Sequence, residues 1–228
     1  MNEHAGIGWI GASGARIVDL SAPLNAQTAV FPGDPPYRLD WHTRIRDSGW
    51  NLSRLETGLH VGAHVDAPLH AFDSGADIAS MPLERFVGEA LAIATPKQPG
   101  EDITPADLAG ADVRPGDIVL FYTGWETRSG TPRFFEGAWP GVSVELVDTL
   151  IGLGAKAIGG DFASLDSPAA LERGAPAHRR ALSAGLPVFE ALVNLREVAG
   201  RRFLFVGLPL RLEGAEGSPE RAIAILPE

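Results

Sequence analysis

The stretch HVGAHVDAPLH, residues 60–70, places three histidines and one aspartate within eleven positions. The whole chain of 228 residues contains only six histidines, so half of them lie in this short stretch. Imidazole nitrogens and carboxylate oxygens form a ligand set that suits Zn²⁺, Mn²⁺ or Fe²⁺. The stretch therefore indicates a metal site, with ordinary histidines hydrogen-bonded to the backbone as the alternative. Its four polar side chains are His60, His64, Asp66 and His70.

The backbone of this stretch restricts how its side chains can meet. In a helix, His60 and His64 would share one face, but Asp66 would point away from it. In a straight strand, His60 and Asp66 would share a face but lie about 20 Å apart, at about 3.3 Å per residue. That separation is too large for one metal whose ligands lie at about 2 Å. Because Gly62 and Pro68 favour a change of direction, the sequence predicts a bent ligand loop.

The chemistry of such a site favours catalysis. Three protein ligands leave open positions for water, and a bound metal lowers the pKa of that water toward neutrality. A further histidine beside the ligands can carry the proton that is needed when an amide or ester bond breaks. A structural site is coordinatively closed and has no use for such a proton carrier. A metal-stabilised binding protein without turnover is the alternative from another class.

Composition narrows the partners and the setting. The chain is 45% hydrophobic with a formal net charge of −10, which indicates a globular protein and argues against nucleic-acid or anionic-membrane surfaces. It has no cysteine, so disulfides and thiolate chemistry are excluded. No run of about 18 apolar residues and no secretory signal pattern is found, so we expect a cytoplasmic protein without a membrane span. Its expected partners are a small-molecule substrate and further copies of the chain.

Hydrophobic periodicity predicts a single α/β domain with a covered mixed sheet over residues 15–228, preceded by a flexible, glycine-rich arm at residues 1–14. Alternation of apolar and polar residues predicts a half-buried strand at residues 37–43. The best helix is expected at residues 143–154, where Ser143 is the N-cap. Shorter helices are expected at residues 103–110 and 175–185. Further strands are expected at residues 16–21, 28–31, 89–95, 117–123, 155–161, 186–195, 202–209 and 221–226.

The stretch at residues 60–70 resembles the HxGTHxDxPxH signature of the cyclase family of metal-dependent hydrolases, which includes bacterial kynurenine formamidases and isatin hydrolases. Ala63 stands where many members have Thr, as it also does in kynurenine formamidases. The resemblance spans about residues 16–227 and implies the swivelling β/β/α fold, usually as a homodimer or a larger oligomer. It includes the segments VFPGDPP (30–36), YTGW (122–125), GGDFASLDSP (159–168) and AHRRALSAGLPVFEALVNL (177–195).

The resemblance implies a role for each polar residue of the site. His60, His64 and Asp66 would hold the first metal, and His70 would be the catalytic proton donor and acceptor. In the two-metal members Asp66 would bridge to a second ion, which His178 and Glu190, twelve positions apart, would complete. The expected cofactor is one or two divalent metal ions per chain, Zn²⁺ first and Mn²⁺ second. Two further residues, Ser164 and Asp166, are expected to brace the site.

The resemblance also implies the reaction, which is hydrolysis of a C–N bond in an aryl formamide. N-formyl-L-kynurenine is the leading substrate, and isatin-type lactams, imides and lactones are the alternatives. One departure concerns Phe31, which stands where the formamidases tend to have a Trp that contacts the aromatic ring of the substrate. Phenylalanine still stacks on a ring but lacks the indole N–H. Phe31 is therefore the candidate substrate-binding residue, with a plain core position as the alternative. The Trp9-containing arm is the candidate dimer strap.

Overall fold

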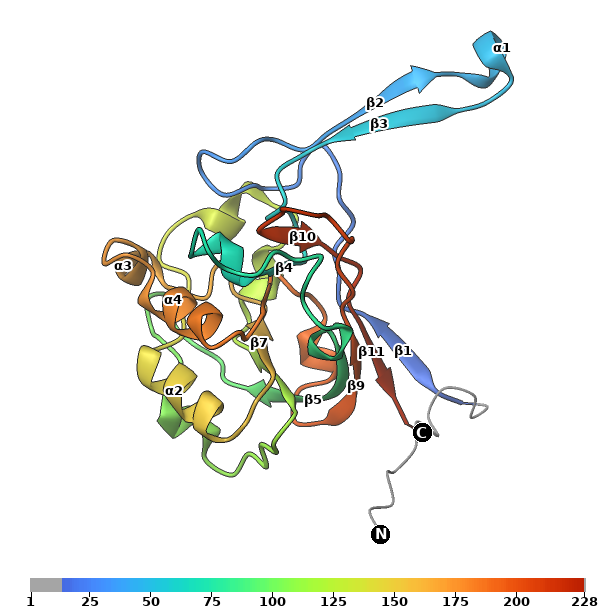
Figure 1. Cartoon of the computed structure of the whole chain (residues 1–228). Helices are drawn as coiled ribbons and strands as arrows, with labels where there is room; N and C mark the ends of the chain where they lie inside the picture. The colour runs from blue at the N-terminus through green and yellow to red at the C-terminus, as the bar shows by residue number, and fades with distance from the viewer. Residues whose placement is uncertain (1–13, 228) are drawn as a thin grey trace.

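The computed structural model describes residues 14–227, so the predicted strap around Trp9 lies outside the described residues. Nine strands form one curled sheet, and a two-stranded hairpin projects from the body (Figure 1). The hairpin consists of β2 (Arg38–Thr43) and β3 (Leu52–Glu56), with α1 (Ile45–Ser48) at its tip. The strand order of the sheet is β1 (Arg16–Asp19), β11 (Ile223–Leu226), β9 (Arg202–Val206), β5 (Val87–Ala94), β6 (Ile118–Tyr122), β7 (Ala157–Gly160), β8 (Val188–Glu190), β4 (His64–Asp66) and β10 (Gly217–Pro219).

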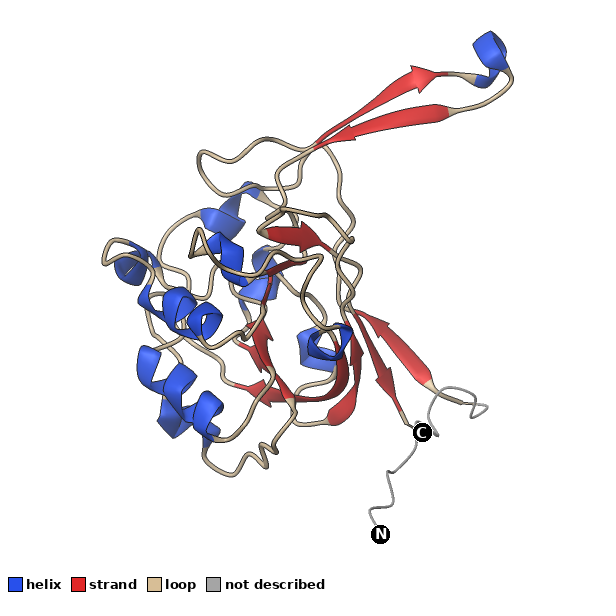
Figure 2. Ribbon diagram, in the orientation of Figure 1, coloured by secondary structure: helices blue, strands red, loops and turns tan. Residues whose placement is uncertain are grey.

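The sheet is mixed, as the sequence predicts. Its central strands β5, β6, β7 and β8 run parallel, and every other pairing in it is antiparallel. The helices α2 (Val144–Gly152), α3 (Pro168–Leu171) and α4 (Pro176–Ser183) gather on one side of the sheet (Figure 2). Short 3₁₀ helices lie at Pro68–His70, Leu83–Arg85, Pro105–Leu108, Trp125–Arg128, Pro132–Phe135 and Leu195–Glu197.

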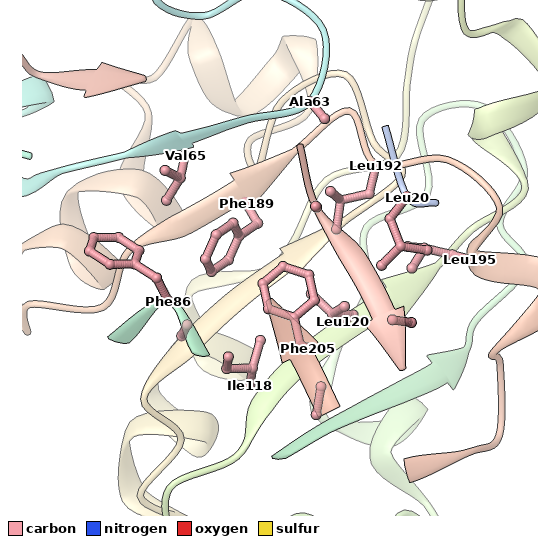
Figure 3. Close-up of a cluster of buried hydrophobic side chains, with 14 of the residues drawn as sticks. Leu20, Ala63, Val65, Phe86, Ile118, Leu120, Phe189, Leu192, Leu195 and Phe205 are labelled. Carbon is pink, nitrogen blue, oxygen red and sulfur yellow. The ribbon is translucent and has the colours of Figure 1, made fainter. Parts of the chain in front are cut away.

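Two apolar cores cover the two faces of the central strands. In β5, Ala90 and Ala92 face one core while Leu91 and Ile93 face the other, which follows from the two-residue period of a strand. The first core lies inside the curled sheet, where the rings of Phe189 and Phe205 meet at 4.9 Å (Figure 3). The second core is closed by α2 and α4. A sheet that is covered on both faces confirms the expected α/β architecture.

Local sequence signals locate α2 and α4 correctly, but they overextend the strand predicted at residues 186–195. Ser143 caps α2 by accepting a hydrogen bond from the backbone N–H of Leu146. Residues 186–195 are predicted as one long strand, but β8 is short and ends at Glu190. The reason is that Ala191 and Asn194 adopt left-handed backbone angles, with φ of 55° and 58°, which no strand accommodates. Residues 28–31 form only one isolated bridge, between Val30 and Val61.

The prediction of a half-buried strand at residues 37–43 is wrong for the single chain. Both strands of the hairpin are exposed over nearly their whole length, with Leu39 53% and Trp41 50% accessible. The predicted alternation of apolar and polar residues is seen in the hairpin. Leu39 pairs with Leu55 on one face, and Arg38 pairs with Glu56 on the other. The hairpin extends away from the body, however, so no core of the same chain lies beneath its apolar side (Figure 1). Over residues 14–227, no helix has the length and apolar character needed to cross a membrane.

Candidate metal centre and active-site cavity

The stretch at residues 60–70 bends as predicted, and it contains a short strand after the bend. Gly62 adopts a φ of +58°, a left-handed angle that favours glycine, and a Cβ atom there would lie 2.5 Å from Cδ2 of Leu24. His64 and Asp66 then lie on β4, with side chains on the same face of the strand. Pro68 opens a 3₁₀ helix that ends at His70. The bend returns His60 to Asp66, with Nδ1 of His60 2.8 Å from Oδ1 of Asp66.

The sheet register brings Glu190 to this motif. β4 lies between β8 and β10, with His64 opposite Glu190 on one side and Asp66 opposite Gly217 on the other. Nε2 of His64 lies 3.4 Å from Oε2 of Glu190 and 3.6 Å from Oδ1 of Asp66. Gly217 leaves room for the imidazole of His60, whose Cε1 would lie 3.1 Å from a Cβ atom there. The antiparallel pairing of two short strands thus joins residues far apart in the chain.

His178 reaches the same point from α4. Asp166 accepts hydrogen bonds from the backbone N–H of Ala177 at 3.0 Å and of His178 at 2.9 Å, which fixes the start of that helix. The same carboxylate accepts from Nδ1 of His178 at 2.7 Å, so Nε2 of the ring is left as an acceptor. That Nε2 lies 3.0 Å from Oε1 of Glu190 and 3.5 Å from Oδ2 of Asp66. Asp166 therefore orients His178 toward the two other carboxylates.

The polar atoms of the cluster fit a divalent cation. Nδ1 of His64 donates to the carbonyl of Gly62 at 2.8 Å, which leaves its Nε2 as an acceptor too. That Nε2 and both oxygens of Asp66 are buried and have no hydrogen-bond partner within residues 14–227. Acceptor atoms that face one another in a buried site need a proton or a cation between them. Two overlapping sets each bring their ligand atoms within 4.8 Å of one another: His60, His64 and Asp66, and Asp66, His178 and Glu190.

The pKa shifts show that the two carboxylates of the cluster stay ionised and favour positive charge on the imidazoles beside them. Burial alone would raise the pKa of Asp66, but the neighbouring imidazoles of His60, His178 and His64 hold it well below its usual range. Burial would also raise the pKa of Glu190, but the charge of His178 lowers it to about 2. Burial would lower the pKa of His60, whereas the carboxylate of Asp66 raises it to about 9. Two buried carboxylates that stay ionised attract either protons or a metal ion to the surrounding imidazoles.

A cavity of about 330 Å³ opens above the cluster. His60, His64, His178 and Glu190 line it together with His70. The ring of His70 lies 4.2 Å from that of His60 and 6.0 Å from that of His178, measured between centroids. Burial lowers the pKa of His70, because the surrounding protein disfavours the charged imidazolium. The neutral ring therefore faces the cavity as a group able to accept or pass on a proton.

Aromatic side chains form one wall of the cavity. Phe31 and Phe135 both line it, and their rings meet edge to face at 5.7 Å. Trp139 packs behind Phe31 at 6.3 Å. Phe31 is partly buried, so it is at once a member of a small apolar cluster and a surface that a bound ring can touch. The wall suits a flat aromatic substrate.

The structure brings all the residues singled out in the sequence to one place. These residues are His60, His64, Asp66, His70, His178, Glu190 and Phe31. Ser164 lines the cavity, and Asp166 lies behind His178. The sequence patterns did not indicate three further charged residues of the site. These are Glu216, whose Oε1 lies 3.4 Å from Nε2 of His60, and the cavity residues Asp34 and Arg179. Asp34 lies within the segment VFPGDPP, and Arg179 directly follows His178. Their closeness to these segments in the sequence is the signal that could have identified the two residues.

Comparisons with known proteins identify the family of this chain. Residues 18–167 match the family model Cyclase, described as "Putative cyclase". A kynurenine formamidase of Paracidovorax citrulli is 35% identical over 214 residues, which cover 92% of this chain and 96% of that protein. One from Salinibacter ruber is 30% identical over 213 residues, covering 91% of this chain and 96% of that protein.

Solved structures have the same fold. Isatin hydrolase A from Ralstonia solanacearum superposes with a TM-score of 0.85 and 25% identity, covering 93% of this chain and 92% of that one. A potential metal-dependent hydrolase with cyclase activity gives a TM-score of 0.78 and 26% identity, covering 94% and 100%. The chain therefore belongs to the cyclase family and is a hydrolytic enzyme with the expected fold. In that family it is similar to kynurenine formamidases in sequence and to isatin hydrolases in structure.

Proposed function

We propose that this protein is a metal-dependent amidohydrolase that converts N-formyl-L-kynurenine to L-kynurenine and formate. The observation that carries the proposal is the convergence of five metal-ligating side chains beneath a cavity with an aromatic wall. Sequence relatives named kynurenine formamidase, at 30% and 35% identity over nearly the whole chain, support this substrate. The structural similarity to isatin hydrolase A makes ring opening of an isatin-like lactam the second candidate.

The proposed metal ligands form two sets that share Asp66. His60, His64 and Asp66 would hold one divalent ion, and His178 and Glu190 would join Asp66 around a second. Mixed imidazole and carboxylate ligands suit Zn²⁺, which we propose first, and Mn²⁺. When bound, such a cation lowers the pKa of water and polarises a carbonyl group.

The remaining residues of the site would position the substrate and move protons. Phe31 and Phe135 would hold the aromatic ring against the cavity wall. His70, a neutral imidazole that faces the cavity beside His60, would take up a proton and deliver it to the departing aryl nitrogen. Asp166 would keep Nε2 of His178 free for the metal. Because His70 lies in an open cavity, its position supports turnover rather than a purely structural metal site.

The test is an ultraviolet assay of N-formyl-L-kynurenine hydrolysis by the metal-loaded protein, with a chelator-treated sample in parallel. We expect turnover that the chelator abolishes and that added Zn²⁺ or Mn²⁺ restores. Isatin is assayed beside it under the same conditions. Hydrolysis of isatin alone by metal-loaded protein would favour the second candidate, whereas turnover that survives chelation would contradict the proposed metal chemistry.

We also propose that the protein is a homodimer in which the hairpin is covered by a second copy. A two-stranded hairpin is marginally stable in water, and this one exposes an apolar face formed by Leu39, Trp41 and Leu55. The alternation of residues 37–43 is typical of a half-buried strand. Contact with the surface of a second copy would bury one face of this strand. Light scattering after gel filtration should give a dimer for the wild type and a monomer for the double variant Trp41→Asp, Leu55→Asp. A variant at the hairpin tip, Arg46→Gln, is the matched control, and a wild-type monomer at micromolar concentration would contradict the proposal.

A further inference from the structure

Two charged side chains line the cavity without belonging to the metal-ligating cluster. They are Asp34, from the turn that precedes β2, and Arg179, from α4. Neither forms an ion pair with any residue between 14 and 227. A carboxylate and a guanidinium that line one cavity, and that form no ion pair within the described chain, provide recognition groups of both signs.

The side chain of Arg179 is exposed, and its guanidinium donates two hydrogen bonds to backbone carbonyls. Its Nε donates to the carbonyl of Gly174 at 3.1 Å, and its Nη1 donates to the carbonyl of Ala71 at 3.3 Å. These two bonds leave Nη2 without an acceptor in the described part of the chain. Ala71 follows His70 and Arg179 follows His178, so the guanidinium is anchored beside the proposed catalytic residues. An arginine restrained by two hydrogen bonds loses less side-chain entropy than a free one when it binds a carboxylate.

The carboxylate of Asp34 stands on the same turn as Phe31. The backbone N–H of Asp34 donates to the carbonyl of Phe31 at 3.0 Å, which closes the turn and directs both side chains to one cavity. Asp34 is half-buried, and among residues 14–227 no donor is bonded to its carboxylate. A half-buried carboxylate without a donor is suited to an ammonium group.

We infer that Arg179 binds the carboxylate, and Asp34 the ammonium group, of an α-amino acid substituent on the aromatic substrate. This inference rests on the proposed function, since it assigns the recognition groups of that same site. The aromatic ring would lie against Phe31 and Phe135 while the scissile amide faces the metal-ligating cluster. A zwitterionic group satisfies both unpaired charges at once, whereas a neutral lactam would cover them without a partner. The two residues thus determine specificity for an aryl amide that carries an amino acid.

The test compares two aryl formamides that differ only in this group. N-formyl-L-kynurenine carries the amino acid, and 2-formamidoacetophenone keeps the formamide and the neighbouring ketone without it. Arg179→Gln should lower kcat/KM for the amino acid substrate about tenfold to a hundredfold more than for the neutral one, mainly through KM. Asp34→Asn should shift the same ratio in the same direction, and Arg179→Lys, which keeps the charge but loses the planar fork, should fall between. Arg173→Gln, an exposed arginine that does not line the cavity, is the matched control.

A second readout separates this inference from the proposed function. Calorimetry measures binding of L-kynurenine and of 2-aminoacetophenone to the metal-loaded protein, without any turnover. If the wild type hydrolyses neither formamide but binds L-kynurenine in a manner that depends on Arg179, the proposed function fails and the assignment of the two residues stands. If Arg179→Gln and Asp34→Asn change both substrates, or both ligands, by the same factor, the two residues do not recognise the amino acid and the inference is overturned.

Discussion

Buried carboxyl groups in two neighbouring parts of this protein have opposite ionisation states. Asp66 and Glu190 lie among three histidines, and although burial opposes it, those imidazoles keep both pKa values low. Glu220 follows β10, whose Pro219 is opposite His64, and its carboxyl oxygens have no partner within the described residues. Burial alone raises the pKa of Glu220 to about 8. The two sites differ in whether a cationic partner lies beside the buried carboxyl, and this difference separates the ionised carboxyl groups from the protonated one.

The largest effect is expected from removing the imidazole of His64, which lies beside both Asp66 and Glu190. His64→Ala should lose bound metal and reduce kcat/KM by at least about a thousandfold, because a cation and its ligand geometry are lost together. His70→Ala is the matched variant, and it should keep its metal while losing a comparable part of its turnover. Metal analysis and kinetics on the same samples check both outcomes. Equal metal loss in the two variants would identify His70 as a ligand instead.

The next effect concerns the carboxylate behind His178. Asp166→Asn should weaken metal binding about tenfold to a hundredfold, since the amide no longer holds the imidazole with its Nε2 as an acceptor. Saturating metal should recover much of the activity, which separates an orienting role from a ligand role. Competition with a chromophoric chelator measures the affinity. Asp148→Asn, an exposed carboxylate on α2, is the control, and unchanged affinity in Asp166→Asn would contradict the orienting role.

The unpaired carboxyl should affect stability rather than activity. The folded-state pKa of Glu220 is raised from 4.5 to about 8, so the folded protein retains a proton that the unfolded chain loses. Wild-type stability should therefore fall as pH rises from about 4.5 to 8, and Glu220→Gln should remove this loss. At pH 8 we expect the variant to be more stable by about 2–4 kcal/mol, with little difference near pH 4.5. Denaturant titrations at both pH values test this, and Glu213→Gln on the surface is the control. A stability difference between Glu220→Gln and the wild type that does not change with pH would show that Glu220 is not neutral in the folded protein.

The smallest effect is expected from a carboxylate paired near the surface. Nζ of Lys97 lies 2.8 Å from Oδ1 of Asp107, and Oδ2 of the same carboxylate accepts from the backbone N–H of Thr104. Burial opposes the shift, but these hydrogen bonds lower the pKa of Asp107, so their stabilisation is present at neutral pH and lost as pH falls through the folded-state value. Lys97→Met should reduce the free energy of unfolding by about 0.5–1 kcal/mol at pH 7 and less at acid pH. A larger loss at acid pH than at pH 7 would contradict this sign.

The sequence predicted those parts of the fold and site that depend on local signals. The concentration of histidines at residues 60–70 indicated a metal site, and Gly62 and Pro68 predicted the bend that the structure shows. Ser143 and the apolar stripe behind it located α2. These features depend on interactions between residues close in the chain, such as caps, turns and periodic burial. The roles of His178 and Glu190 came only from the family resemblance, because neither has a local signal of its own.

Tertiary structure alone decided the features that require distant segments to meet. The register of β4 with β8 places His64 opposite Glu190, and Asp166 turns His178 toward them from another segment. The same packing leaves Glu220 without a partner and places Asp34 and Arg179 in one cavity. It also directs the hairpin away from the body. The strand at residues 38–43, whose alternating pattern predicts a buried face, is therefore exposed in the single chain. The amino-acid pattern specifies which faces are apolar and which groups can ionise, but only the packed chain determines what each face and each charge meets.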